Sequence, residues 1–175
     1  MKAIKGILTA AAVTATLAFA SNAAAQTDTA TLTVTATVAS ACSIESGTLD
    51  FGPYDPVGVN SPTGVDLIGS GTLSVTCTLA GTAVITLGQG ANPDAGSTEA
   101  APARRMLNTL SADYLSYDLY QDTTRLEIWG NTEPTGLPYT GTGEAEDVTV
   151  YGTVPLGQNV PAGSYIDTVV ATITF

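Results

Sequence analysis

The sequence predicts an all-β protein, and three observations support this class. Short segments rich in Thr, Val and Leu alternate apolar with polar residues, which is the period of a strand with one buried face. Turn-forming residues separate these segments, and the chain contains 18 Gly and 9 Pro. The sequence offers no convincing apolar stripe at helical spacing. We therefore expect short strands packed as two sheets around one core.

The chain begins with the pattern of an export signal. Lys2 and Lys5 precede an uncharged apolar run over residues 7–19, and three alanines at residues 23–25 fit a small-residue cleavage site. The apolar run is shorter than the roughly 20 residues that span a bilayer. We expect residues 1–25 to be removed as a signal peptide on export through the periplasm, and we expect no membrane insertion of the remaining chain.

Eight segments are expected to form strands, and they are residues 30–40, 48–51, 71–79, 83–87, 115–120, 126–129, 148–154 and 164–175. Turn signals such as Gly52-Pro53 stand between them. Such regular punctuation favours an immunoglobulin-like β-sandwich. Tyr117 and Trp129 fall within two of these segments, so we expect both rings in the core rather than on a binding platform.

Two cysteines, Cys42 and Cys77, lie in the part of the chain that is expected to be exported. In that setting they are most simply interpreted as one disulfide, which would join an early strand to a middle one. Closing a loop of this size stabilises a fold by roughly 4 kcal/mol in the chain-entropy model. A redox or metal role is not expected, because the chain has no C-x-x-C motif and no histidine.

The first strand-like segment alternates threonine with apolar residues from residue 31 to residue 38. Leu32, Val34, Ala36 and Val38 would share one face of a strand. A strand of this kind needs a sheet that buries its apolar face and pairs its backbone groups. The alternation does not decide whether that sheet belongs to the same domain or to a neighbouring molecule.

The last strand-like segment also alternates, with Val169, Ala171, Ile173 and Phe175 on one face. The chain ends at Phe175, so we expect a sandwich that closes on this strand to be one strand short. Such a sandwich would keep an apolar groove and an open edge. An extended strand from another chain would fill both by β-augmentation.

Several motifs, taken in order, resemble the spore coat protein U domain, which is shared by major subunits of archaic chaperone-usher pili. The resemblance covers essentially the whole chain after the signal. It rests on Cys42, Leu49-Asp50-Phe51-Gly52, Leu73-Ser74-Val75-Thr76-Cys77, Arg105-Met106, residues 115–122, Trp129-Gly130, residues 151–155 and residues 161–167.

The resemblance implies an incomplete immunoglobulin-like β-sandwich that is completed by donor-strand exchange. Residues 26–40 would be the donor segment and residues 41–175 the acceptor domain. Leu32, Val34, Ala36 and Val38 would fill the next subunit, whose groove would be bordered by Val169, Ala171, Ile173 and Phe175.

The resemblance also implies partners and a location. The partners would be further copies of the chain, a periplasmic chaperone and an outer-membrane usher, and the product a surface pilus for adhesion and biofilm formation. Spore-coat proteins share the domain. A secreted coat or surface-layer protein that folds as a self-contained monomer is therefore an alternative, and a carbohydrate-binding module is another.

The charge and the residue types argue against other classes of function. Beyond residue 25, 3 arginines stand against 16 Asp and Glu residues, a balance of −13, so neither nucleic acid nor an anionic membrane surface is expected as a partner. Without histidine, and without lysine after the signal, nucleophilic triads and Schiff bases have no residues to use. We expect no enzyme activity and no cofactor.

Two acidic runs remain as candidates for paired carboxylates or a metal site. Glu144, Glu146 and Asp147 are expected in a solvated turn before a strand at Val148. The three aspartates within residues 113–122 lack the spacing of an EF-hand loop. We therefore expect no catalytic pair and no metal site.

Overall fold

The computed structural model describes residues 25–175. Two units are distinguished within the chain, with a boundary between Thr37 and Val38, and the second unit contains every described strand. The predicted signal peptide, residues 1–25, lies outside the described residues apart from Ala25.

The described part of the chain forms nine strands and one short 3-10 helix, and the strands pair antiparallel. The all-β prediction is therefore confirmed. The elements are β1 (Cys42–Ile44), β2 (Leu67–Cys77), β3 (Thr82–Leu87), β4 (Arg104–Asn108), β5 (Tyr114–Tyr120), η1 (Glu133–Thr135), β6 (Leu137–Thr140), β7 (Ala145–Val154), β8 (Tyr165–Ile166) and β9 (Ala171–Thr174).

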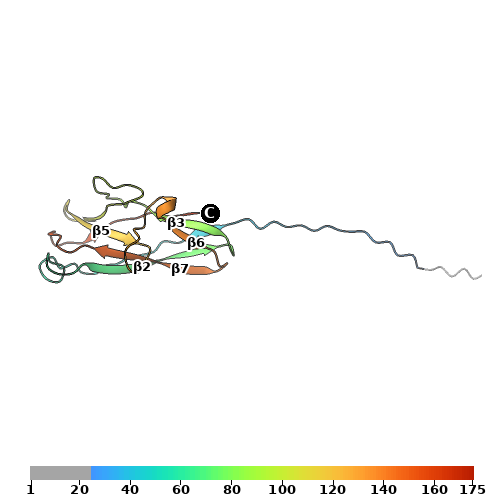
Figure 1. Cartoon of the computed structure of the whole chain (residues 1–175), viewed down its shortest axis with the longest axis horizontal. Helices are drawn as coiled ribbons and strands as arrows, with labels where there is room; N and C mark the ends of the chain where they lie inside the picture. The colour runs from blue at the N-terminus through green and yellow to red at the C-terminus, as the bar shows by residue number, and fades with distance from the viewer. Residues whose placement is uncertain (1–24) are drawn as a thin grey trace, which may run out of the picture. The chain divides into compact units, whose positions relative to one another are not determined.

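The strands are arranged in one large and one small sheet (Figure 1). The large sheet has the order β1-β2-β7-β5-β4-β8 and the small sheet has the order β6-β3-β9. The long pairing of β2 with β7, from Leu67 opposite Val154 to Thr76 opposite Ala145, forms the centre of the large sheet. The apolar faces of both sheets meet in one core, in which Val75, Ile85 and Trp129 are completely buried.

Trp129 and Arg104 join the two sheets through backbone carbonyls. The indole Nε1 of Trp129 donates to the carbonyl of Ile85 at 2.8 Å. Arg104 on β4 is only 1% exposed, and its guanidinium donates to the carbonyls of Leu87, Gly88 and Trp129 at 2.8, 2.8 and 2.7 Å. Burial lowers the pKa of this guanidinium, and the three carbonyls replace the water that burial removes. The predicted burial of Tyr117 and Trp129 is confirmed.

A disulfide joins Cys42 to Cys77, as the sequence predicts. The two residues lie opposite each other in the β1–β2 pairing, with their Cα atoms 4.1 Å apart. The N–H of Ala41 also donates to the Thr78 hydroxyl at 3.1 Å, and the N–H of Thr78 donates to the Ala41 carbonyl at 2.9 Å. The beginning of the domain is therefore held to β2 and to the residue that follows it by a covalent bond as well as by hydrogen bonds.

The segment predicted as one last strand is divided between the sheets. Its first part, β8, pairs with β4 of the large sheet, and its second part, β9, pairs with β3 of the small sheet. Asp167 lies at the crossover and accepts hydrogen bonds from the Tyr117 hydroxyl at 2.6 Å, the Ala91 N–H at 2.8 Å and the Asn92 amide at 3.1 Å. Burial, followed by the bond to Asp167, raises the pKa of Tyr117 and keeps its hydroxyl protonated as a donor.

Other expectations about the strands need correction. Residues 30–40 form no strand, since an extended segment gains stability only when a partner strand takes its backbone hydrogen bonds. Residues 48–51 and 126–129 each contribute one isolated bridge, Leu49 with Gly71 and Ile128 with Tyr120. The short strands β1, β4 and β6 were not predicted, and β7 begins at Ala145 rather than at Val148.

Reduction of the disulfide provides a test of its contribution to stability. The bridge spans a sequence separation of 35 residues, and its loss should lower the free energy of unfolding by roughly 4 kcal/mol. Urea unfolding followed by tryptophan fluorescence, with and without reductant, measures this change. A Cys42→Ala/Cys77→Ala variant is the control and should be insensitive to reductant. Equal stability of the oxidised and reduced wild type would contradict the expectation.

Replacing Tyr117 by Phe tests the hydrogen bond that fixes the crossover. We expect the free energy of unfolding at pH 7 to fall by about 1.5 to 3 kcal/mol, the usual range for a hydrogen bond to a charged group. Tyr165→Phe, which removes only an exposed hydroxyl bond to the Pro161 carbonyl, is the control and should cost less.

The same variant makes a prediction about pH. A tyrosine whose pKa is raised by folding stabilises the protein fully below the unfolded pKa of about 10, and this contribution is lost as the pH rises further. The stability gap between wild type and Tyr117→Phe should therefore narrow above about pH 10 in urea titrations. A gap that widens there would contradict the assignment.

Candidate functional site

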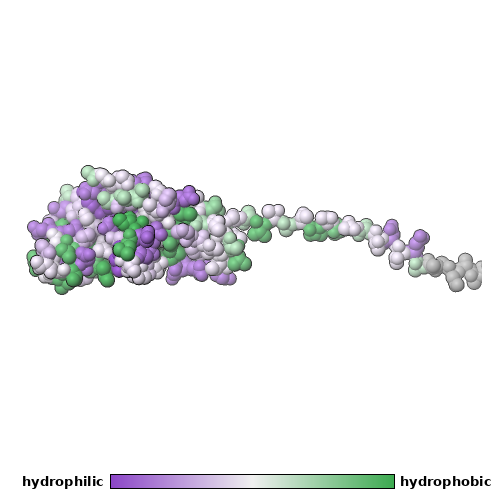
Figure 2. All heavy atoms as spheres, in the orientation of Figure 1, coloured by the Kyte–Doolittle hydropathy of each residue, from purple (hydrophilic) through white to green (hydrophobic). Residues whose placement is uncertain are grey.

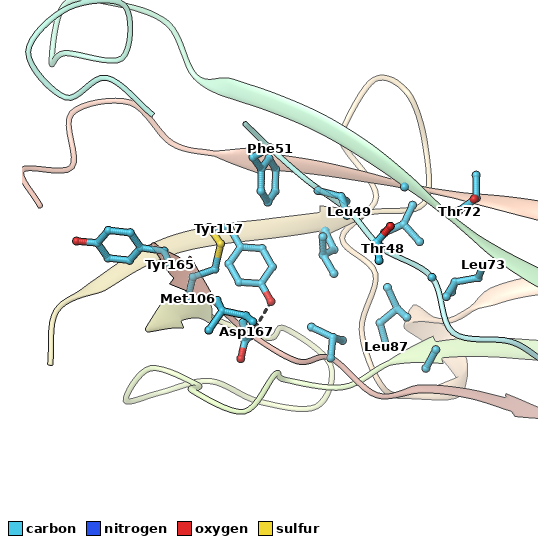
Figure 3. Close-up of a pocket in the computed structure, with 17 residues that line it drawn as sticks. Thr48, Leu49, Phe51, Thr72, Leu73, Leu87, Met106, Tyr117, Tyr165 and Asp167 are labelled. Carbon is cyan, nitrogen blue, oxygen red and sulfur yellow. Dashed lines mark hydrogen bonds between the residues drawn. The ribbon is translucent and has the colours of Figure 1, made fainter. Parts of the chain in front are cut away.

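A groove between the two sheets is the main candidate for a functional site. It encloses about 380 Å³, and Figure 3 shows the side chains that surround it. Its floor is apolar and comes from strands of both sheets. The floor residues are Leu73 of β2, Leu87 of β3, Met106 of β4, Leu119 of β5 and Val150 of β7.

One wall of the groove is the segment that follows β1. Leu49 bridges to Gly71, which extends the edge of the large sheet beyond β1. Phe51 turns inward and meets the ring of Tyr117 edge-on, with ring centroids 6.0 Å apart and an interplanar angle of 63°. Gly152 makes room for Phe51, because a Cβ at position 152 would lie 2.6 Å from the tip of that ring.

The opposite wall is the crossover from β8 to β9. Every second residue of this segment is half-buried and lines the groove: Tyr165, Asp167, Val169 and Ala171. In Figure 3 the labelled carboxylate of Asp167 points to the Tyr117 hydroxyl, and a dashed line marks their hydrogen bond. This wall is therefore held by a buried tyrosine as well as by strand pairing.

The predicted acceptor residues are distributed over two places. Val169 and Ala171 line the groove, and Ile173 packs against the core. Phe175 is 58% exposed and borders a different depression, together with Thr172 and Thr174. The prediction did not include Tyr165 and Asp167, although the alternation of the segment extends back to them, nor Phe51, although it belongs to the Leu49-Asp50-Phe51-Gly52 motif.

The groove continues past Phe51 into a second hollow of about 600 Å³. Leu49, Phe51, Met106 and Tyr165 line both spaces, so the two hollows are neighbours. An open groove with an apolar floor is suited to an extended peptide segment, because alternate side chains can enter it while the others remain in water.

The N-terminal segment, residues 25–40, has no strand or helix. Its apolar residues are open to solvent: Leu32 is 84%, Val34 81% and Val38 83% exposed, and Ala36 is exposed as well. Figure 2 shows hydrophobic side chains along this segment. The chain thus carries both an exposed apolar segment and, in its domain, an apolar groove.

The acidic run at residues 144–147 lies at the surface of the described part of the chain. Glu144, Glu146 and Asp147 are exposed, and the Tyr139 hydroxyl donates to Glu146 at 3.1 Å. Glu146 and Asp147 lie within β7 rather than in a turn. Within residues 25–175, no group of three or more His, Cys, Asp or Glu side chains could hold a metal ion. No helix in the same residues has the length and apolar character that crossing a membrane requires.

Comparisons with known proteins find a matching family and a similar fold. The family model of the Spore Coat Protein U domain matches residues 28–172. Protein U of Myxococcus xanthus is 63% identical over 179 aligned residues, and the alignment covers both chains completely.

A similar solved structure is the CsuC-CsuE chaperone-tip adhesion subunit pre-assembly complex from archaic chaperone-usher Csu pili of Acinetobacter baumannii. The TM-score is 0.50 at 19% identity, over 79% of this chain and 40% of the other chain, so this likeness concerns the fold. The match over residues 28–172 and the full-length identity of 63% show that the chain belongs to the Spore Coat Protein U domain family.

Proposed function

We propose that this chain is a structural subunit that polymerises non-covalently by donor-strand complementation into a surface fibre of the chaperone-usher pilus type. The observation that carries this proposal is the coexistence of an apolar groove with an exposed, alternating apolar segment in the same chain. Residues 26–40 of one copy are the donor, and residues 41–175 of the next copy form the incomplete sandwich that accepts it. Residues 1–25 direct export before assembly.

The free energies of apolar burial and of backbone hydrogen bonding favour a strong joint, meaning the contact between the donor segment of one copy and the groove of the next, without a covalent link. Burying Leu32, Val34 and Val38 stabilises the joint by about 1.5 to 3 kcal/mol for each side chain, and the smaller Ala36 adds less. Each backbone hydrogen bond between the donor and the groove edge adds a net of about 0.5 to 1.5 kcal/mol. The open side of β9, an edge strand of the small sheet, supplies partners for such bonds.

The open groove also explains why assembly factors belong to the proposal. An exposed apolar groove with an edge strand beside it is prone to uncontrolled pairing. A periplasmic chaperone would cover it until an outer-membrane usher exchanges the chaperone for the next subunit. The similarity to a chain from a chaperone-tip adhesion subunit complex supports this at the level of the fold.

A coat or surface-layer protein that folds as a self-contained monomer is the second candidate. The observation in its favour is the family itself, since the matching model describes a spore coat domain and the relative that is 63% identical is Protein U. The two candidates differ in one measurable respect, which is whether copies of the chain are linked through strands.

The first experiment is gel mobility of the exported protein in SDS, with and without boiling, together with negative-stain microscopy. Strand-exchanged polymers should run as a ladder that collapses to one monomer band on boiling, and they should appear as thin fibres. A monomer band under both conditions, with no fibres, would support the self-contained coat protein instead.

A double substitution in the donor segment tests which residues carry the joint. Val34→Asp/Val38→Asp places two charges on the apolar face and should abolish the ladder, because neither carboxylate can be desolvated in an apolar groove. Thr33→Asp/Thr37→Asp adds the same charge on the other face of the segment. This control variant should still form the ladder. Fibres at wild-type yield from the first variant would contradict the donor assignment.

A further inference from the structure

The wall of the groove contains one charged residue in an otherwise uncharged row. Tyr165, Asp167, Val169 and Ala171 follow each other at intervals of two residues, and all four line the groove. An occupant strand beside this wall would place its inward side chains opposite these four. Asp167 therefore differs chemically from every other position that a docked strand meets along the row.

The carboxylate of Asp167 cannot move away from an occupant. Its Oδ2 accepts the hydrogen bond of Tyr117, and its Oδ1 accepts those of Ala91 and Asn92. Gly90 has a φ of 82°, and any Cβ there would collide with this carboxylate, so the loop approaches closely only because residue 90 is a glycine. A carboxylate that is fixed in this way retains water on its groove side unless an apolar side chain displaces that water at a cost.

The donor segment has a small residue at one of its four apolar positions. Leu32, Val34, Ala36 and Val38 repeat at the same interval of two residues as the row on the wall. If all four donor side chains lie opposite the four residues of the wall, the donor strand can run in only two directions relative to the wall, antiparallel or parallel. A register shifted by two residues leaves one donor side chain outside the row.

We propose that Asp167 sets the register and direction of the docked strand, so that Ala36 of a second copy lies opposite Asp167 and the two segments run antiparallel. This inference rests on the proposed function and adds the residue that determines specificity in the same groove. The smallest donor side chain covers the carboxylate least. In the parallel arrangement Val34 would lie opposite Asp167 and would displace its water.

The sizes of the remaining side chains favour the same arrangement. In the antiparallel register Leu32, the largest donor residue, lies opposite Ala171, the smallest residue of the row. Val34 then lies opposite Val169, and Val38 opposite Tyr165. In the parallel register Leu32 would lie opposite Tyr165, which places the two largest side chains together and leaves Val38 with Ala171.

Cysteine pairs test the direction in the full chain. Directly opposed residues of antiparallel strands bring their Cα atoms to about 4.5 to 5.5 Å, which lies within the range that a disulfide bridges. Leu32→Cys/Ala171→Cys should give a ladder that survives boiling without reductant and collapses with it. The matched pair Val38→Cys/Ala171→Cys should give at least tenfold less covalent ladder, and peptide mass spectrometry identifies the bridged cysteines.

Each other outcome has a defined meaning. A covalent ladder from Val38→Cys/Ala171→Cys alone, or from neither pair while the wild type still forms its boiling-sensitive ladder, would overturn the register but leave strand exchange intact. A bridged monomer would show that the segment closes its own domain, which overturns both proposals. Absence of the wild-type ladder removes the proposed function itself.

A second comparison examines the space opposite Asp167. Ala36→Val adds two methyl groups where the carboxylate lies and should lower fibre yield at least tenfold. Ala30→Val makes the same change on the same face, but outside the four positions, and should stay within twofold of the wild type. Equal yields from the two variants would contradict the role of Asp167.

Discussion

The course of residues 165–174 is the constraint on which the rest of the structure depends. This segment belongs to both sheets, because it pairs with β4 as β8 and with β3 as β9. The crossover between them forms one wall of the groove, and the segment around Leu49 and Phe51 forms the other. The groove is therefore a consequence of topology, because the chain supplies one strand to two sheets.

The walls of this groove are fixed by interactions that do not involve an occupant. Asp167 holds the crossover through Tyr117, Arg104 ties β4 to the end of β3, and the disulfide holds β1 on β2. A site that is formed in advance loses little conformational freedom when a strand enters it. The cost of ordering in the proposed joint would then fall mainly on the donor segment, which has no strand or helix of its own. The polar network around the groove would thus support the proposed docking of an apolar strand.

The alternation of apolar and polar residues predicts the longer strands that bury one face. It misses the short strands β1, β4 and β6. β2, β3, β5 and β7 follow from the period of apolar residues. β4 contains Arg104, which a pattern based on hydrophobicity places outside, yet its guanidinium is buried and donates three hydrogen bonds to backbone carbonyls through Nε and Nη2. Residues 164–175 do alternate inward and outward, but alternation carries no information about which strand is the neighbour.

The same limit applies to the groove. Val169 and Ala171 could be predicted because they lie in an alternating segment. Phe51 could not be placed, since its position depends on a glycine at residue 152, about a hundred residues later in the chain. Asp167 is polar in a row of apolar residues, so its inward direction depends on Tyr117, a partner that only the tertiary structure brings near.

The asymmetry between the segment and the groove decides what kind of assembly can follow. An isologous interface uses the same patch on both partners and closes into a dimer. In the proposed contact the two surfaces differ, because one is an extended segment and the other a groove lined by residues of both sheets. A contact between such surfaces leaves a free segment on one copy and a free groove on the other. Under the proposed function each addition would therefore recreate the site for the next, and a heterologous contact of this kind leads to a linear polymer unless the geometry closes a ring.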